Sequence, residues 1–177
     1  MKLRALRVRN VGPFGEDGCA LENLSDGLNV ICERNEAGKS TLFTALQMAL
    51  FEKHTSRKAV IQDFRHDRGS GAPLIEVDID IDGRTYRIAK QYLSSASAVV
   101  LDAVSGERLY EKSEAENWIL RSMGGDRPED GPSGLLWVRQ GDPLVQPKPE
   151  GGAGDALFSL LEGEVDAITG GKRADRV

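Results

Sequence analysis

Residues 32–41 read CERNEAGKST, and the last four of them have the types and spacing of a phosphate-binding loop. Gly38 allows the backbone to come close to phosphate oxygens, because it has no side chain to block the approach. Lys39 can reach the terminal phosphates of a nucleotide, and the hydroxyl group of Ser40 can ligate Mg²⁺. The stretch therefore predicts a site for a Mg²⁺–nucleotide complex such as Mg-ATP.

One position departs from the common pattern G-x-x-x-x-G-K-[ST], which has a glycine where this chain has Glu33. A residue with a side chain fits there if its dihedral angles stay in the ordinary region. We expect the carboxylates of Glu33 and Glu36 to point away from the phosphates. The residues predicted to bind the nucleotide are Asn35, Glu36, Ala37, Gly38, Lys39, Ser40 and Thr41.

The elements around the loop have the order that such a site needs. Residues 28–31, LNVI, form a compact apolar run bounded by turn signals, which predicts a buried central strand. Residues 40–51 are strong helix formers with apolar side chains at helical spacing. Shorter strands are predicted near residues 3–8 and 19–24. Strand, glycine-bearing loop and helix together are the context of a phosphate-binding loop.

A hairpin is predicted downstream, where apolar and polar residues alternate over 75–81 and Asp82-Gly83 forms a two-residue turn. Counting outward from the turn places Ile79 opposite Tyr86, Val77 opposite Ile88, and Asp78 opposite Arg87.

Further elements follow the hairpin. A strand is predicted at 98–103, and Ser113 to Glu116 read as a capping box that opens a helix through Arg121. A buried strand is predicted within GLLWVRQGD at 134–142, and a last helix at 155–161. The fold class predicted from these elements is α/β with a mixed β-sheet that includes the antiparallel hairpin.

Composition sets limits on the class of protein. The chain has 177 residues, 40% of them apolar and 29% charged, with a net charge of −5, which fits one soluble domain. The two cysteines have neither metal-ligand nor disulfide-framework spacing. The N-terminus does not read as a secretory signal, and no apolar run is long enough to span a membrane. A cytoplasmic location is therefore expected.

The stretch from Lys53 to Arg68 is rich in basic residues, and two interpretations stay open. It is either a loop that faces DNA or the nucleotide, or a solvated linker between helix and hairpin that is balanced by acidic residues. The nucleic-acid candidates are Lys53, Arg57, Lys58, Arg65 and Arg68. The two histidines in it, His54 and His66, have no cysteine neighbours and do not read as a metal site.

The stretch RNEAGKSTL, the LNVI run before it and LLWVRQGD near residue 140 resemble the N-terminal ATPase lobe of the SMC-like family of P-loop ATPases. That family includes the SbcC and YhaN-type proteins. The resemblance implies the N-lobe of an ABC/SMC-type, AAA-type ATPase head that binds ATP and Mg²⁺. It implies that Gln140 is the Q-loop glutamine, which contacts Mg²⁺ or the attacking water, and that Lys39 and Gln140 are the catalytic residues.

The resemblance also implies what the lobe needs for turnover. In this family the Walker B and signature motifs lie in a C-terminal lobe beyond a long coiled coil, and neither motif occurs in this sequence. We therefore expect a lobe over 1–170 and, at 171–177, a tail that starts a coiled coil. Such a lobe would bind ATP with little turnover alone. The implied partners are the C-terminal lobe, a second head in a homodimer, DNA and a nuclease subunit, with a nucleoid-associated role in DNA repair or DNA-end processing.

Two other functions stay open. A self-contained P-loop kinase for a small molecule would turn over alone with a phosphoryl acceptor, although its loop usually follows the first strand. A non-catalytic module that binds nucleotide as a regulator would bind without any turnover.

Overall fold

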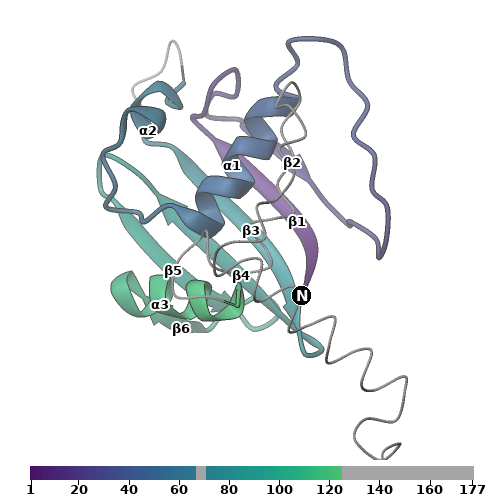
Figure 1. The fold of residues 1–177 in the computed structure, drawn as a ribbon, viewed down its shortest axis with the longest axis vertical. Coiled ribbons are helices and arrows are strands. Elements are labelled where there is room, and N and C mark those ends of the chain that lie inside the picture. Colours follow the sequence, from purple (N-terminus) through teal and green to yellow (C-terminus); the bar gives the residue numbers. More distant parts are fainter. Residues whose placement is uncertain (67–70, 125–177) are drawn as a thin grey trace, which may run out of the picture. The chain divides into compact units, whose positions relative to one another are not determined.

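The computed structural model describes residues 1–66 and 71–124 (Figure 1). The chain divides into two compact units, residues 1–118 and 119–177. The first unit holds the β-sheet, the first two helices and the start of the third. Of the second unit, only residues 119–124 are described. The predicted elements at 134–142 and 155–161, the glutamine Gln140, and the tail at 171–177 lie outside the described residues, as does Arg68.

The first unit is built on a six-stranded sheet with the order β2-β1-β3-β4-β5-β6. The strands are β1 (Lys2–Arg9), β2 (Cys19–Leu21), β3 (Leu74–Ile81), β4 (Arg84–Gln91), β5 (Ser97–Asp102) and β6 (Arg108–Glu111). Every pair of neighbouring strands is antiparallel. The parallel pairs of the predicted mixed sheet therefore do not occur among the described residues. Short turns join β3 to β6 in succession, and short turns join only antiparallel neighbours.

The hairpin of β3 and β4 confirms the register predicted from the sequence. Ile79 lies opposite Tyr86, Val77 opposite Ile88, and Asp78 opposite Arg87. Asp82 and Gly83 have φ angles of 50° and 80°, as a two-residue turn with left-handed residues requires.

Three helices accompany the sheet: α1 (Lys39–Phe51), α2 (Ala59–Asp63) and α3 (Lys112–Ser122). Helix α1 lies across one face of the sheet, over β1, β3 and β4 (Figure 1). Its buried residues Leu42, Ala45 and Met48 belong to the same core as Val77 and Ile88. Burying apolar side chains between these two layers stabilises both, and it fixes the axis of α1 relative to the strands.

The predicted buried strand at 28–31 is wrong for the structure. Residues 22–38 form no regular element. Leu24 still donates a backbone hydrogen bond to Arg4 of β1, and Figure 1 shows most of the connection from β2 to α1 as a long segment away from the sheet. Leu28 is 89% exposed and Val30 is 71% exposed. The sequence pattern is that of a strand, but none of the described strands pairs with it. An isolated strand leaves its backbone groups and apolar side chains in water, so it is not formed alone.

The predicted capping box at the start of α3 is also wrong, although the helix itself is present and passes Arg121 as predicted. The carboxylate of Glu116 is buried and accepts hydrogen bonds from His54 and Lys90, so it does not return to Ser113. A charged side chain that is taken from water needs strong partners, and these donors supply them. Within the described part of the chain, no helix is long and apolar enough to cross a membrane.

Candidate nucleotide-binding site

The N-terminus of α1 is open to an anion. Gly38 precedes the helix with φ 92° and ψ 14°, no side chain caps the first turn, and the first turn has no acidic residue. The first N–H groups of a helix have no partner inside the helix, and the helix dipole places partial positive charge there. Lys39, Ser40 and Thr41 thus offer backbone donors where the sequence predicted the phosphates of a nucleotide to bind.

A turn formed by residues 10–15 holds the loop from the side. Its backbone is closed by a hydrogen bond of 2.9 Å from the Val11 N–H to the Phe14 carbonyl oxygen. A Cβ atom on Gly38 would lie 2.5 Å from a ring carbon of Phe14, and one on Gly12 would lie 3.0 Å from the methyl group of Thr41. Sequence analysis missed this contact. The signal available was the glycine and proline content of NVGPFG, which marks a turn but not its neighbour.

Lys39 is held by the loop in which it lies. Its ammonium group donates hydrogen bonds of 2.7 Å to the carbonyl oxygens of Glu33 and Arg34. The side chain therefore already points toward the interior of the loop, where two carbonyl oxygens accept hydrogen bonds from its ammonium group. Phosphate oxygens are stronger acceptors for an ammonium group than neutral carbonyl oxygens.

The two acidic residues of the loop lie differently. The carboxylate of Glu33 is exposed and accepts a hydrogen bond of 3.0 Å from the N–H of Arg34. Glu36 is exposed and has a φ angle of 67°, a left-handed conformation that residues with side chains rarely adopt. Asn35 and Ser40 are exposed as well, which leaves their side chains accessible to a ligand.

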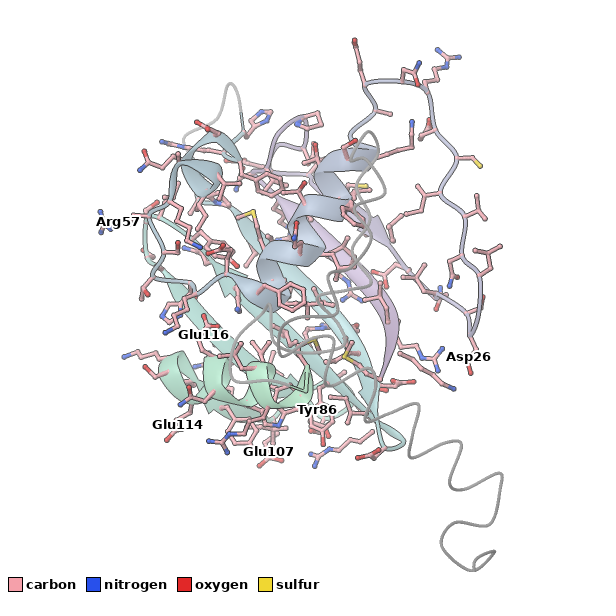
Figure 2. The ribbon with its side chains drawn as sticks, in the orientation of Figure 1. Asp26, Arg57, Tyr86, Glu107, Glu114 and Glu116 are labelled. Atoms are coloured by element: carbon pink, nitrogen blue, oxygen red, sulfur yellow. The ribbon has the colours of Figure 1, made fainter. Side chains whose placement is uncertain are left out.

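The basic stretch is mostly at the surface. Lys53, Arg57 and Arg65 are exposed, and Lys58 pairs with Glu52 at 2.8 Å. Figure 2 shows Arg57 extending outward from the connection between α1 and α2. The residues Arg57, Gln62, Arg65 and Leu93 line an open pocket of about 310 Å³.

The end of the basic stretch is tied to the turn at 10–15. Arg65 forms a backbone bridge with Val11, and His66 Nδ1 donates a hydrogen bond of 2.7 Å to the carbonyl oxygen of Gly12. The other histidine, His54, is buried beside Glu116. Within residues 1–66 and 71–124, no three potential ligands come together as a metal site.

An antiparallel sheet covered by a helix whose open N-terminus carries the sequence G-K-S-T defines the class of the protein: an α/β P-loop ATPase lobe. Residues 5–142 match an AAA domain family (AAA_23), and the chain belongs to this family. The match covers the loop, the sheet and the stretch that contains Gln140.

Comparison with solved structures gives the same fold. A chain from a study of ATP-driven dimerization and DNA stimulated activation of SMC ATPases aligns with a TM-score of 0.55 at 19% identity. The alignment covers 93% of this chain and 99% of that one. The comparison with curated proteins gave no match. The fold is thus similar to that of a chain from work on SMC ATPases, and together with the family match it confirms the resemblance to a P-loop ATPase lobe of the SMC-like type.

Proposed function

We propose that this chain binds Mg-ATP at Asn35 to Thr41 as the N-terminal lobe of an SMC-like ATPase that acts in DNA repair or DNA-end processing. The observation that carries the proposal is the uncapped N-terminus of α1, with Gly38 before it and the ammonium group of Lys39 on the loop side. On binding, phosphate oxygens replace the carbonyl oxygens of Glu33 and Arg34 as acceptors for Lys39. The helix amides take the remaining phosphate oxygens.

The residues present fit Mg²⁺ as a cofactor. Ser40 has an exposed hydroxyl group in the first turn of α1, and hydroxyl and amide oxygens are the hard ligands that Mg²⁺ takes together with water and phosphate oxygens. We assign Ser40 and Gln140 to the metal and Lys39 and Gln140 to catalysis. The metal would neutralise charge on the phosphates. A change of Ser40 to Ala is expected to leave nucleotide binding measurable but to weaken its dependence on Mg²⁺.

The proposed partner for turnover is a C-terminal lobe. The exposed apolar run at 28–31 supports it, because a strand added beside this run would bury Leu28 and Val30 and would fix the start of the loop. We propose that residues 1–170 form the lobe and that 171–177 begin the connection to a coiled coil. The SMC study named above concerns ATP-driven dimerization, and we propose that ATP likewise brings two complete heads of this protein together.

Titration calorimetry of Mg-ATP into the chain tests the proposal, with Lys39→Ala as the variant and Lys112→Ala as a control for the loss of one exposed lysine. Saturable binding is expected for the wild type and the control and should be lost in Lys39→Ala. Equal heats from all three proteins would refute the assignment of the loop. Turnover by the chain alone in the presence of a phosphoryl acceptor would instead favour a small-molecule kinase.

We also propose that the basic stretch contacts DNA phosphates. The exposed positions of Arg57 and Arg65 at one pocket support this, since guanidinium groups suit phosphate contacts. Duplex binding measured over a range of salt should then have a smaller salt slope in Arg57→Gln, by about 0.9 for each phosphate contact removed. Arg108→Gln is the control, because this exposed arginine lies on β6. An unchanged slope in Arg57→Gln and Arg65→Gln would leave these residues as a solvated linker.

A further inference from the structure

Three titratable side chains meet in the interior of the first unit, away from the phosphate loop. They are His54, just after α1, Lys90 on β4, and Glu116 on α3, and we call them the buried cluster. Their side chains are 9%, 1% and 8% exposed, respectively. Figure 2 shows Glu116 on the side of α3 that faces the sheet, whereas Glu114 lies on the opposite side of the same helix.

Glu116 joins the other two members of the cluster. One of its carboxylate oxygens accepts a hydrogen bond of 2.6 Å from the ammonium group of Lys90. The other accepts from the backbone N–H of His54 at 2.7 Å and from its Nδ1 at 2.9 Å. Since a carboxylate only accepts, Nδ1 carries the proton. A single side chain of α3 thus holds both the segment after α1 and a strand of the sheet.

The same cluster closes the C-terminal end of α1. Lys90 donates a second hydrogen bond, of 2.9 Å, to the carbonyl oxygen of Glu52. The hydroxyl group of the buried Tyr92 donates to the carbonyl oxygen of Met48 at 2.8 Å and to that of Glu52 at 3.3 Å. The Met48 carbonyl also accepts the backbone N–H of Glu52 at 2.9 Å, so Tyr92 is a second donor to it. The Glu52 carbonyl lies just beyond the helix, and Lys90 places positive charge there, where the C-terminal end of a helix attracts it.

Stability alone does not account for charged residues at this place. Replacing a buried ion pair by apolar side chains of similar volume is often neutral or stabilising. Burial lowers the pKa of Lys90 even though the attraction of Glu116 opposes this, so the ionised lysine is not fully compensated. The charges and hydrogen bonds instead provide specificity, because they hold the segment after α1, strand β4 and helix α3 in one arrangement.

We propose that the buried cluster of His54, Lys90 and Glu116 is a coupling element that joins the far end of the nucleotide-binding helix to α3. Helix α1 has 13 residues, so its two ends are about 20 Å apart at 1.5 Å per residue. A shift of α1 that follows phosphate binding at Gly38 and Lys39 reaches Glu52 and His54 at its other end. Because Glu116 binds His54 and Lys90, the shift of α1 also moves α3, the helix that carries Glu116. The chain continues from α3 toward Gln140. The nucleotide part of this inference rests on the proposed function.

Hydrogen exchange without nucleotide tests the coupling element itself. The variant is Glu116→Gln, which keeps the shape but removes the charge, and the matched control is Glu114→Gln on the exposed side of α3. We expect exchange to become at least about tenfold faster in both 48–54 and 112–118 for Glu116→Gln, a loss of about 1.4 kcal/mol of local stability, and to stay unchanged for the control. Faster exchange in 112–118 alone, with 48–54 unchanged, would overturn the proposal. If Glu116→Gln does not fold, Lys90→Met/Glu116→Gln removes both buried charges and is judged by the same two segments.

A second measurement adds Mg-ATP. Protection of residues 35–42 is expected in the wild type and in Glu116→Gln, but protection of 112–118 only in the wild type. Equal protection of 112–118 in both proteins would contradict the coupling. A lack of protection at 35–42 in the wild type would contradict the proposed function instead, while the measurement without nucleotide still decides the coupling element.

Discussion

The ammonium group of Lys39 lies 2.7 Å from the carbonyl oxygen of Glu33 and at the same distance from that of Arg34. The ammonium group of Lys39 thus forms its hydrogen bonds with backbone carbonyl groups at the start of the same loop. In the proposed function, phosphate oxygens exchange with these acceptors, so we expect the groups around Glu33 to affect the affinity for the nucleotide.

The first prediction concerns the charge of Glu33. Glu33→Gln should bind Mg-ATP about two- to fivefold more tightly, because an exposed carboxylate near a triphosphate is unfavourable by roughly 0.4–1 kcal/mol. The gain should shrink as salt is raised, since the interaction is screened. Calorimetry at two salt concentrations measures it, with Glu107→Gln as a distant control. A gain that does not depend on salt would show that the hydrogen bond to Arg34 matters and not the charge.

The second prediction concerns the left-handed backbone of Glu36. Glu36→Gly should tighten Mg-ATP binding about two- to fivefold, because a negative charge is removed, and should stabilise the folded chain by roughly 1 kcal/mol, because glycine accepts φ 67° without penalty. Asp82→Gly makes the same two changes at φ 50° in the β3–β4 turn and should leave binding unchanged. Titration of the three proteins checks this. Weaker binding by Glu36→Gly would mean that the carboxylate serves the site.

The third prediction concerns the packing of Gly38 on Phe14. Gly38→Ala should abolish nucleotide binding and lower the stability by about 2 kcal/mol or more, since a Cβ atom would lie 2.5 Å from the ring and φ is 92°. Adding Phe14→Ala should remove the clash with the ring but not the approach of 2.9 Å to Cγ of Pro13, and so recover part of the stability of Gly38→Ala. Urea unfolding of the single and double variants measures the recovery. Additive losses in the double variant would argue against this contact.

The fourth prediction concerns Asp78, which is 6% exposed on the sheet face opposite α1. Burial alone would raise its pKa, but hydrogen bonds from Arg87 and Arg7 outweigh it, and the pKa lies below 3.8. A lowered carboxyl pKa contributes stability above pH 3.8 that is lost as the pH falls through the pKa of the folded state. Asp78→Asn should cost about 2–3 kcal/mol at pH 7, because Arg87 loses its carboxylate partner and Arg7 keeps only Glu22.

Urea unfolding of Asp78→Asn and wild type between pH 7 and pH 3 measures this cost. The difference should shrink below pH 3.8, where the wild-type carboxyl group also takes up a proton. Glu107→Gln, which alters an exposed carboxylate on the surface, is the control. A constant difference across the range would show that packing, and not charge, is responsible.

The fifth prediction concerns the lowered pKa of Lys90. Between that pKa and 10.5, the folded chain binds fewer protons at this site than the unfolded chain, so the contribution of Lys90 to stability rises with pH. Lys90→Met removes this rise. The stability of wild type minus that of Lys90→Met should therefore increase from pH 8 to pH 10.5 in urea unfolding. Lys112→Met, which alters an exposed lysine, is the control. Parallel curves for wild type and Lys90→Met would contradict the prediction.

Local patterns were sufficient for part of this fold. The register of β3 and β4 follows from alternation and from Asp82-Gly83, which are neighbours in the sequence. The helix after Gly38 follows from its composition, and the loop from its motif. These features depend on interactions within about twenty residues, which the sequence displays directly.

Features that depend on distant partners were not predictable in the same way. The run at 28–31 has the composition of a strand but lacks a neighbour among the described residues. Glu116 is the acidic residue of the predicted capping box, yet its carboxylate forms hydrogen bonds with Lys90 and His54, which are 26 and 62 residues away. The contact between Phe14 and Gly38 depends on how a turn docks against a helix. In each case tertiary structure decides against a local preference.

The exposed apolar segment at 28–31 has a consequence for the nascent chain during synthesis. None of the described residues pairs with it, and in the proposed function the strand that covers it belongs to a C-terminal lobe, which is made later or as another chain. Roughly 90 residues separate this segment from the end of the described chain, and ribosomes add about 5–20 residues per second. For on the order of 5 to 20 s, a nascent chain would therefore expose Leu28, Val30 and Ile31 next to the proposed nucleotide site. A holding chaperone that binds short apolar segments would have its target there.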